Sequence, residues 1–139
     1  MIDQISVFLE NEVGRLSAFS ETLADNKINI KAICIADTTD FGILRCIVDK
    51  PEVAVDVLKK KGFTASITKV LGVSVCDVSG GLHHVLDILT KAEIGVDYIY
   101  SLVRSADGCA DLIFKVEDPA AAAKTLEAQG IPVLKTEDI

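Results

Sequence analysis

Apolar and polar side chains alternate near the start of the chain and then change to a helical spacing. Residues 4–9 follow the two-residue period of a half-buried strand. Residues 15–26 carry apolar side chains at Leu16, Phe19 and Leu23, the stripe of an amphipathic helix. The residues between these segments form a predicted turn. The chain is therefore expected to open with a strand, a turn and a helix.

The pattern then predicts two strands, a helix and a further strand. In order, these elements are strand 28–36, a polar hairpin loop at 37–40, strand 41–48, helix 51–62 and strand 63–70. Pro51 suits the first turn of this second helix, and Gly62 suits its end. Val53, Val57 and Leu58 form its predicted apolar face.

The second half of the chain repeats the first. Gly14, in the turn before the first helix, returns as Gly80, an offset of 80 − 14 = 66 residues. Pro51 returns as Pro119, so the offset later grows to 119 − 51 = 68 residues. The other matched pairs are Leu23 with Leu89, Ile28 with Ile94, Ile30 with Val96, Ile33 with Ile99, Gly42 with Gly108, Leu58 with Leu126 and Gly62 with Gly130. A repeat of this length indicates a duplicated small domain rather than a solenoid unit.

The second copy predicts the same order of elements as the first. They are strand 73–76, helix 81–92, strands 94–103 and 109–116, helix 119–129 and strand 131–134. The order βαββαβ is that of the ferredoxin-like fold, in which two helices cover one face of a four-stranded antiparallel sheet. The predicted fold class is α+β, with two ferredoxin-like βαββαβ units in tandem. Because Gly72 interrupts a strand-like run, we place the units at residues 1–71 and 72–139.

Composition and charge exclude several classes of function. Acidic residues outnumber basic ones by 21 to 14, which gives a net charge of −7. That balance is opposite to the basic surface that a nucleic-acid backbone requires. No apolar run approaches the roughly 18 residues of a membrane span, and the first residues lack the features of a secretion signal. We therefore expect a cytoplasmic protein that binds neither nucleic acid nor membrane.

The four cysteines do not form a recognisable site in the sequence. Cys34, Cys46, Cys76 and Cys109 are widely spaced and include no C-x-x-C pair, so they match neither a zinc site nor a thioredoxin motif. Cys34 and Cys46 lie in apolar runs, where a reduced cysteine behaves as a small apolar residue. The prediction is four reduced thiols, with no metal and no cofactor.

Two further pairs of residues have structural interpretations. His83 and His84 are adjacent on the predicted helix, so their side chains diverge by about 100° and cannot chelate one metal ion. They lie off the stripe that includes Val85, and we expect them to face solvent or an interface. Tyr98 and Tyr100 share one face of a strand, where they pack in the core or at an interface, or one of them lines a pocket.

The predicted fold hosts many functions, so any chemistry must come from particular residues. An RNA-binding domain of this fold stacks bases on aromatic residues of its central strands, and residues 42–48 contain none. A hydrolase of the acylphosphatase type would need a basic phosphate cradle beside the first helix. Arg15 is the only arginine there, and Gly81 takes its place in the second copy. No nucleophile can be paired with a base, so we expect no catalytic residues and no enzymatic activity.

The turn before the first helix of each copy is a candidate anion site. Gly14 leaves room for a ligand to approach the backbone. The helix that begins there offers unpaired N–H groups and the positive end of its dipole. Gly14 and Gly80 would also be required simply to make a tight turn from strand to helix. Both interpretations stay open at this point.

Two stretches of the first copy resemble the ACT domain family, whose members bind amino acids and regulate metabolic enzymes. Residues 6–16 (SVFLENEVGRL) are similar to that family's entry to the first helix. Residues 26–30 (NKINI) are similar to its entry to the second strand, with Asn26 and Lys27 in place of the usual glycine. The resemblance covers both units. It implies antiparallel sheets that pair edge to edge into a roughly eight-stranded sheet with helices on one face, and ligand pockets at the interface between units.

The resemblance also implies which residues bind the ligand. Asparagines at the positions of Asn11 and Asn29 hydrogen-bond the ligand in amino-acid-binding members, and an amide suits both an ammonium and a carboxylate. The second copy departs from this pattern, with Asp77 and Gly95 at these positions. Asp77 either binds an ammonium group or caps the following helix. The candidate ligand-binding residues are Asn11, Glu12, Val13, Gly14, Arg15, Asn29, Asp77, Val78, Ser79, Gly80 and Gly81.

The hypothesis from the sequence is a tandem ACT domain protein that acts by allosteric regulation. It is expected to bind an amino acid or a similar small carboxylate between ACT units, to form a homodimer and to modulate a partner metabolic enzyme. The two kinds of pocket are expected to differ, because neither combines both asparagines within one chain. The alternative is a structural protein–protein interaction module of the same fold with vestigial ligand pockets.

Overall fold

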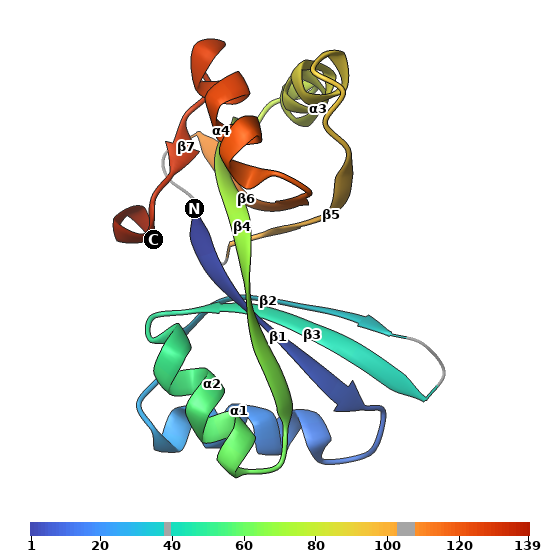
Figure 1. The fold of residues 1–139 in the computed structure, drawn as a ribbon, viewed down its shortest axis with the longest axis vertical. Helices are drawn as coiled ribbons and strands as arrows, with labels where there is room; N and C mark the ends of the chain where they lie inside the picture. Colours follow the sequence, from blue (N-terminus) through green and yellow to red (C-terminus); the bar gives the residue numbers. More distant parts are fainter. Residues whose placement is uncertain (38–39, 103–107) are drawn as a thin grey trace. The chain divides into compact units, whose positions relative to one another are not determined.

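The chain folds as two compact units, whose elements are drawn in Figure 1. The computed structural model describes three stretches, residues 1–37, 40–102 and 108–139. We call Asp3–Thr68 the amino-terminal unit, and Met1–Ile2 together with Lys69–Ile139 the carboxy-terminal unit. Residues 38–39 of the predicted hairpin loop, and Val103 at the end of a predicted strand, lie outside the described residues.

The amino-terminal unit has the predicted elements in the predicted order. They are β1 (Ile2–Glu10), α1 (Arg15–Asp25), β2 (Ile30–Asp37), β3 (Phe41–Val48), α2 (Pro51–Lys60) and the first part of β4 (Thr64–Cys76). The strand order is β2-β3-β1-β4, and β3 pairs antiparallel with both β1 and β2. Helices α1 and α2 lie together on one face of this sheet (Figure 1). This arrangement confirms the ferredoxin-like plan for the first copy.

The carboxy-terminal unit repeats the plan with the second part of β4 as its first strand. The other elements are α3 (Gly81–Lys91), β5 (Val96–Ser101), β6 (Cys109–Val116), α4 (Pro119–Ala128), β7 (Val133–Leu134) and a short 3₁₀ helix (Thr136–Asp138). The strand order β5-β6-β4-β7 matches β2-β3-β1-β4 of the first unit, and the printed pairings are again antiparallel. The tandem of two βαββαβ units is therefore confirmed.

Strand β4 runs without a break through the predicted boundary at Gly72. The interpretation of Gly72 as an interruption was wrong, because it lies opposite Ile113 and Leu134 in regular strand pairing. A β carbon on Gly72 would stand 2.5 Å from Ile2 Cδ1 and 3.0 Å from Leu134 Cβ. The glycine therefore permits close packing across β4. Because one strand closes the first unit and opens the second, the described residues contain seven strands where about eight were expected.

All four α-helices end in the same hydrogen-bonded motif. After α1, the Ile28 N–H donates to the Leu23 carbonyl at 3.0 Å, and the Lys27 N–H donates to the Ala24 carbonyl at 3.0 Å, which is a Schellman motif. This motif explains why β2 begins at Ile30, two residues later than predicted. Among the described residues, no helix has the length and apolarity needed to cross a bilayer.

The central residue of this motif adopts a left-handed conformation in each helix end. Gly62 and Gly130 follow α2 and α4, whereas Lys27 and Glu93, with φ of 55° and 59°, follow α1 and α3. Glycine adopts this conformation easily, but a side chain makes it costly. The pairs are separated by the same offsets that the sequence repeat predicts.

Each unit has its own apolar core between the sheet and its two helices. In the amino-terminal unit, Phe19 and Leu23 of α1 are buried as predicted, but Leu16 is 44% exposed. The predicted face of α2 was partly wrong, because Ala54 is buried with Leu58 while Val53 is 48% exposed. The carboxy-terminal core consists of Leu71, Val73, Val75, Val85, Leu89, Phe114, Val116, Ala122 and Leu126.

Candidate functional site

The turns that follow β1 and β4 have the same backbone hydrogen bonds. The Asn11 N–H donates to the Asp40 carbonyl at 2.9 Å, and the Asp77 N–H donates to the Gly108 carbonyl at 3.0 Å. One residue later, the N–H groups of Glu12 and Val78 donate to the carbonyls two residues before them, both at 2.9 Å. The structure therefore places the two candidate turns at equivalent positions of the two units.

The glycines in these turns are required by backbone conformation. Gly14 has a φ of 89° and Gly80 a φ of 84°, which side chains rarely adopt. No protein atom lies within 4 Å of a β carbon built on either residue, so the space above both is open to solvent. Gly81 differs, because a β carbon there would overlap the Cys76 carbonyl oxygen. The tight-turn interpretation of Gly14 and Gly80 thus holds whether or not a ligand binds.

Helices α1 and α3 begin without a side-chain cap. Gly14 and Gly80 occupy their N-cap positions, and no side chain accepts a hydrogen bond from the first turn of either helix. By contrast, α4 is capped by Asp118, whose carboxylate accepts from the Ala121 N–H at 3.1 Å. The interpretation of Asp77 as a helix cap therefore finds no support. The first turns of α1 and α3 keep N–H groups that an anion could satisfy.

Arg15 is held against its own unit at the start of α1. Its Nε lies 3.1 Å from Glu10 Oε2, and the guanidinium carbon lies 4.3 Å from the centre of the Phe63 ring. The ion pair and the cation–π contact fix the positive charge next to the turn. Neither Glu10 nor Phe63 was identified from the sequence, because both belong to strand segments distant from the turn motif.

Most of the candidate side chains on the two turns face solvent. Asn11, Glu12 and Asp77 are exposed. Val13 is fully exposed and Val78 is 68% exposed. An exposed valine at the same place in both units has no packing role within its own unit.

Asn29 lies just before β2 and is linked to Asp49, which follows β3. The Asn29 N–H donates to Asp49 Oδ1 at 3.0 Å, and the Asp49 N–H donates to the Asn29 carbonyl at 3.2 Å. This exchange fixes the backbone of Asn29 while its side chain stays exposed. Asp49 was not predicted as a supporting residue, because only the register of β2 with β3 brings it next to Asn29.

The two asparagines lie at opposite ends of the amino-terminal sheet. Ile30 at the start of β2 is paired with Val48, whereas Glu10 at the end of β1 is paired with Phe41 at the other end of β3. Asn11 therefore follows one end of the sheet and Asn29 precedes the other. One unit cannot direct both side chains at the same small ligand.

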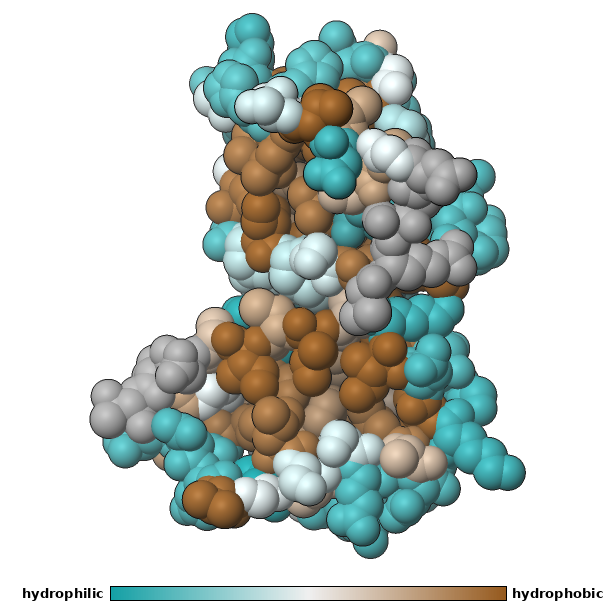
Figure 2. All heavy atoms as spheres, turned by 180° about the vertical axis from the view of Figure 1, so that it is seen from behind, coloured by the Kyte–Doolittle hydropathy of each residue, from teal (hydrophilic) through white to brown (hydrophobic). Residues whose placement is uncertain are grey.

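Apolar side chains gather on the surface of the amino-terminal unit, as the brown area in the lower half of Figure 2 shows. The exposed residues on its strands are Phe8, Ile33, Ile35, Phe41 and Ile43, each 40–48% exposed. The rings of Phe8 and Phe41 lie in contact, with centroids 4.9 Å apart. An apolar surface of this kind is typical of an interaction site.

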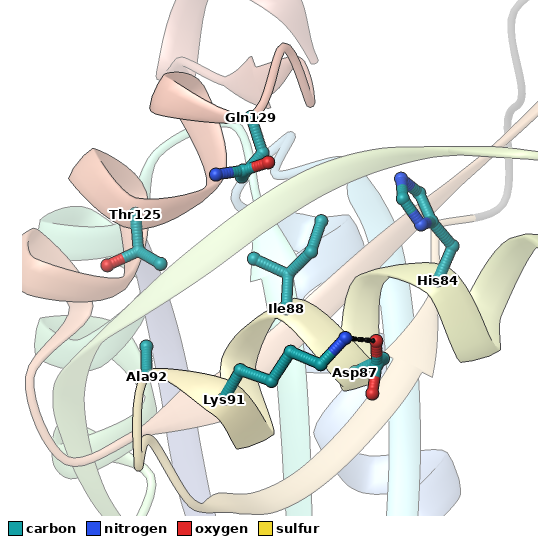
Figure 3. A pocket seen from close by; sticks show the side chains of 7 residues that line it. All are labelled: His84, Asp87, Ile88, Lys91, Ala92, Thr125 and Gln129. Carbon is teal, nitrogen blue, oxygen red and sulfur yellow. Dashed lines mark ion pairs between the residues drawn. The ribbon is translucent and has the colours of Figure 1, made fainter.

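A hollow of about 370 Å³ lies between α3 and α4 (Figure 3). It is lined by His84, Asp87, Ile88, Lys91, Ala92, Thr125 and Gln129. The Lys91 ammonium lies 2.7 Å from Asp87 Oδ2, and this hydrogen bond holds the pKa of the Asp87 carboxyl below its ordinary value. His83 and His84 are exposed, as predicted. None of the candidate ligand-binding residues lines this hollow.

A second hollow, of about 530 Å³, includes Gly95 at the position that corresponds to Asn29. Its other lining residues are Glu93, Ile94, Glu117, Asp118 and Pro119. The three acidic side chains make this hollow unfavourable for a carboxylate. No cluster of metal-ligating side chains is found among the residues with described positions.

The fold and the paired turns define a tandem of ferredoxin-like domains of the regulatory type. The sequence pattern of the family described as "ACT domain pair" matches residues 1–138. The chain therefore belongs to the ACT domain family, as a pair of ACT domains, which are ligand-binding regulatory modules. Comparison with curated proteins gives no match.

Solved structures share this fold over nearly the whole chain. Protein BT0572 from Bacteroides thetaiotaomicron is 36% identical, with a TM-score of 0.92, and the match covers 99% of this chain and 94% of that one. The ligand-free regulatory subunit of aspartate kinase from Thermus thermophilus is 15% identical, with a TM-score of 0.68 and 91% of both chains covered. The corresponding subunit from Thermus flavus is 12% identical, with a TM-score of 0.64, and the match covers 91% of this chain and 90% of that one.

Proposed function

We propose that this ACT domain pair binds an amino acid, or a similar small carboxylate, at the interface between ACT units and thereby modulates a partner metabolic enzyme. The observation that carries the proposal is the turn after β1. It leads into a helix without a side-chain cap and exposes Asn11 beside that helix. The free N–H groups and the helix dipole attract a carboxylate, and the amide oxygen of Asn11 accepts from an ammonium group.

A second copy of the chain supplies the other wall of the proposed pocket. Strand β2 is the edge strand of the amino-terminal sheet. Antiparallel pairing of β2 with its counterpart in another copy would bring the Asn29 end of one strand beside the Asn11 end of the other. Such a homodimer has two equivalent pockets, each with both asparagines.

The surface of β2 supports this pairing. Ile33 and Ile35 are 42% and 40% exposed on the edge strand, where pairing with a second sheet would bury them. Leu16 at the start of α1 is similarly exposed. Burial of these side chains supplies an apolar contribution that hydrogen bonds along the strand alone would not give.

We expect the corresponding positions of the carboxy-terminal unit to bind the ligand weakly or not at all. Asp77 places a negative charge at the turn before α3, and Gly95 offers no side-chain donor or acceptor. The acidic side chains around Gly95 repel a carboxylate further. The amino-terminal unit is therefore the proposed ligand-binding unit.

The proposed mechanism is a shift in population between two arrangements of the ACT units. A ligand that contacts both sides of an interface stabilises the arrangement in which both contacts form. The partner enzyme would respond to that arrangement, and the chain itself would have no catalytic role. We propose that this occurs in the cytoplasm, in accord with the free thiols of all four cysteines.

Calorimetric titration of the full chain with the twenty amino acids tests the proposal. We expect saturable binding of one or a few amino acids. Asn11→Ala and Asn29→Ala should each raise Kd at least about tenfold, because a hydrogen bond to a charged group contributes about 1.5–3 kcal/mol. Asn26→Ala is the matched control, since its amide donates to the Thr22 carbonyl of its own helix, and it should leave Kd unchanged.

The alternative of a structural interaction module predicts a different result. No amino acid would then bind saturably to the folded protein. The two asparagine variants would lose stability in the unliganded state and alter no ligand response. That outcome would replace the proposed function, while a dimer that persists without ligand would still fit the interaction module.

A further inference from the structure

Two cysteines of the carboxy-terminal unit lie directly opposite each other on neighbouring strands. Cys76 is the last residue of β4, and Cys109 is the first residue of β6. The two are paired in the antiparallel register of these strands. Both belong to the same unit, and both are free thiols. Their separation of 33 positions in the sequence concealed this relationship.

The hydrogen bonding next to this pair determines how close the side chains lie. The adjacent residue pair is joined by the bond from the Asp77 N–H to the Gly108 carbonyl, at 3.0 Å. Opposed pairs in an antiparallel ladder alternate between bonded and non-bonded, so Cys76 and Cys109 form a non-hydrogen-bonded pair. In such pairs the Cα atoms are about 4.5 Å apart and the side chains lie closer together. Disulfides commonly span Cα distances of about 4.4–6.8 Å.

The two thiols are also accessible to a reagent. Cys76 is exposed and Cys109 is half-buried. They project from the face of the sheet opposite the core, because their neighbours Val75 and Ala110 take the other side of the alternation and Val75 is a core residue. By contrast, Cys46 is buried in the core of the other unit and Cys34 is paired with Arg45.

We propose that Cys76 and Cys109 form a dithiol modification site, which a low-molecular-weight disulfide such as oxidised glutathione converts reversibly into an intrachain disulfide. The Cys76 thiolate attacks one sulfur of the small disulfide, the S–S bond breaks and one glutathione thiolate leaves with the electron pair. The Cys109 thiolate then attacks the Cys76 sulfur and displaces the second glutathione. In total, two protein thiols are oxidised by two electrons, and the small disulfide is reduced to two thiols.

The disulfide would fix the base of the turn before α3. The Cys76 carbonyl accepts from the Val78 N–H, and the Gly108 carbonyl, beside Cys109, accepts from the Asp77 N–H. In the amino-terminal unit the equivalent strand positions hold Glu10 and Phe41, which are paired in the same register. The modification is therefore specific to one of the two turns. It does not depend on the proposed binding of an amino acid.

Redox titration of the wild-type full chain tests this proposal. The protein is equilibrated in glutathione buffers of increasing oxidised fraction, free thiols are blocked by alkylation, and peptides are identified by mass spectrometry. We expect a monomeric product lighter by two hydrogen atoms, with one peptide pair linked through Cys76 and Cys109. Its Tm should rise by roughly 5–10 °C, since the cross-link constrains the unfolded chain.

Variants and a denatured control complete the test. Cys76→Ser and Cys109→Ser should each stop at a mixed disulfide with glutathione, whereas Cys34→Ser should form the intrachain link like the wild type. The link should form at least about tenfold more readily in the folded protein than in concentrated urea, because folding and disulfide formation stabilise each other. The proposal is overturned if glutathione adds separately to both cysteines, or if the links formed join other cysteine pairs.

Discussion

A β carbon on Gly81 would overlap the carbonyl oxygen of Cys76. That oxygen already accepts from the Val78 N–H at 2.9 Å, so it cannot move away without breaking the turn before α3. The constraint comes from backbone on both sides, and no side-chain rotation can relieve it. The glycine after Gly80 is therefore fixed by packing, whereas Gly80 itself is fixed by its φ of 84°.

We predict that Gly81→Ala lowers the free energy of unfolding by about 2–3 kcal/mol, as expected for overpacking against rigid surroundings. Gly95→Ala is the matched control, because no atom lies within 4 Å of its β carbon and its φ is not positive. It should change stability by less than about 0.5 kcal/mol. Urea unfolding followed by circular dichroism measures both values. Equal effects of the two substitutions would contradict the steric explanation.

Lys27 and Glu93 offer the opposite kind of test. Both adopt a left-handed conformation, with φ of 55° and 59°, at helix ends where Gly62 and Gly130 serve after the other two helices. We predict that Lys27→Gly raises the free energy of unfolding by about 0.5–1 kcal/mol, since glycine adopts positive φ without steric cost. Its carbonyl, which accepts from Lys50 Nζ at 3.1 Å, is retained in the variant.

A glycine in regular helix is the control for that substitution. Lys59→Gly, within α2, should lower the free energy of unfolding by up to about 1 kcal/mol because of the poor helix propensity of glycine. If Lys27→Gly and Lys59→Gly are destabilising to the same degree, the left-handed conformation of Lys27 is not a source of strain.

Much of the fold could be predicted because the repeat doubles every local signal. Gly14 and Gly80 share one backbone conformation and one hydrogen-bonding pattern, so the offset read from the sequence is an offset between equivalent turns. Apolar periods of two and of about 3.6 residues then identified the strands and helices. The order of elements followed from these signals, since each is local in the chain.

The errors came from packing between segments that are distant in the sequence. Gly72 was interpreted as a break, but it is required by the side chains of Ile2 and Leu134 that press against β4 from the two ends of the chain. The face of α2 was misjudged because Ala54, a small residue with a weak apolar signal, lies closest to the core while Val53 is exposed. No local pattern contains that information.

The candidate site was predictable in its turns and not in its supporting contacts. The motif residues Asn11 and Asn29 are adjacent to elements that the sequence defines, and both side chains are exposed. The partners of this region, Glu10 and Phe63 around Arg15 and Asp49 beside Asn29, depend on strand register and tertiary packing. The binding role of the two asparagines stays a prediction.

Cys46 provides a prediction about pH. Burial raises the pKa of its thiol from 9.0 to about 12, because the charged thiolate is disfavoured in the apolar core. A raised pKa in the folded state gives stability that is complete below about pH 9 and is lost as the pH rises toward 12. In that range the unfolded chain releases a proton that the folded chain retains. The free energy of unfolding should therefore fall by up to about 1.4 kcal/mol per pH unit from this group.

Urea unfolding between pH 8 and 11 measures this slope. Cys46→Ala should remove the contribution of one proton from the slope, although the smaller side chain also lowers stability at every pH. Cys76→Ala should leave the slope unchanged, since Cys76 is exposed in both states. With an aromatic disulfide reagent at pH 8, Cys76 should react in the folded protein and Cys46 only after unfolding. Rapid modification of Cys46 in the folded state would contradict the prediction.

The link between Asp49 and Asn29 connects stability with the proposed binding. Asp49 accepts from the Asn29 N–H, and its own N–H donates to the Asn29 carbonyl, so the carboxylate helps to fix the backbone that presents the Asn29 side chain. Asp49→Ala should lower the free energy of unfolding by about 1 kcal/mol, and Asp49→Asn should restore most of it because its amide oxygen can accept the same bond. Asp40→Ala is the control, because only the Asp40 carbonyl contributes to the turn at Asn11. If Asn29 contacts the ligand, Asp49→Ala should also raise the Kd of the bound amino acid several-fold, and Asp49→Asn should bring it back. A loss of stability with an unchanged Kd would show that the Asn29 side chain does not depend on this link, and would weaken the case that it binds the ligand.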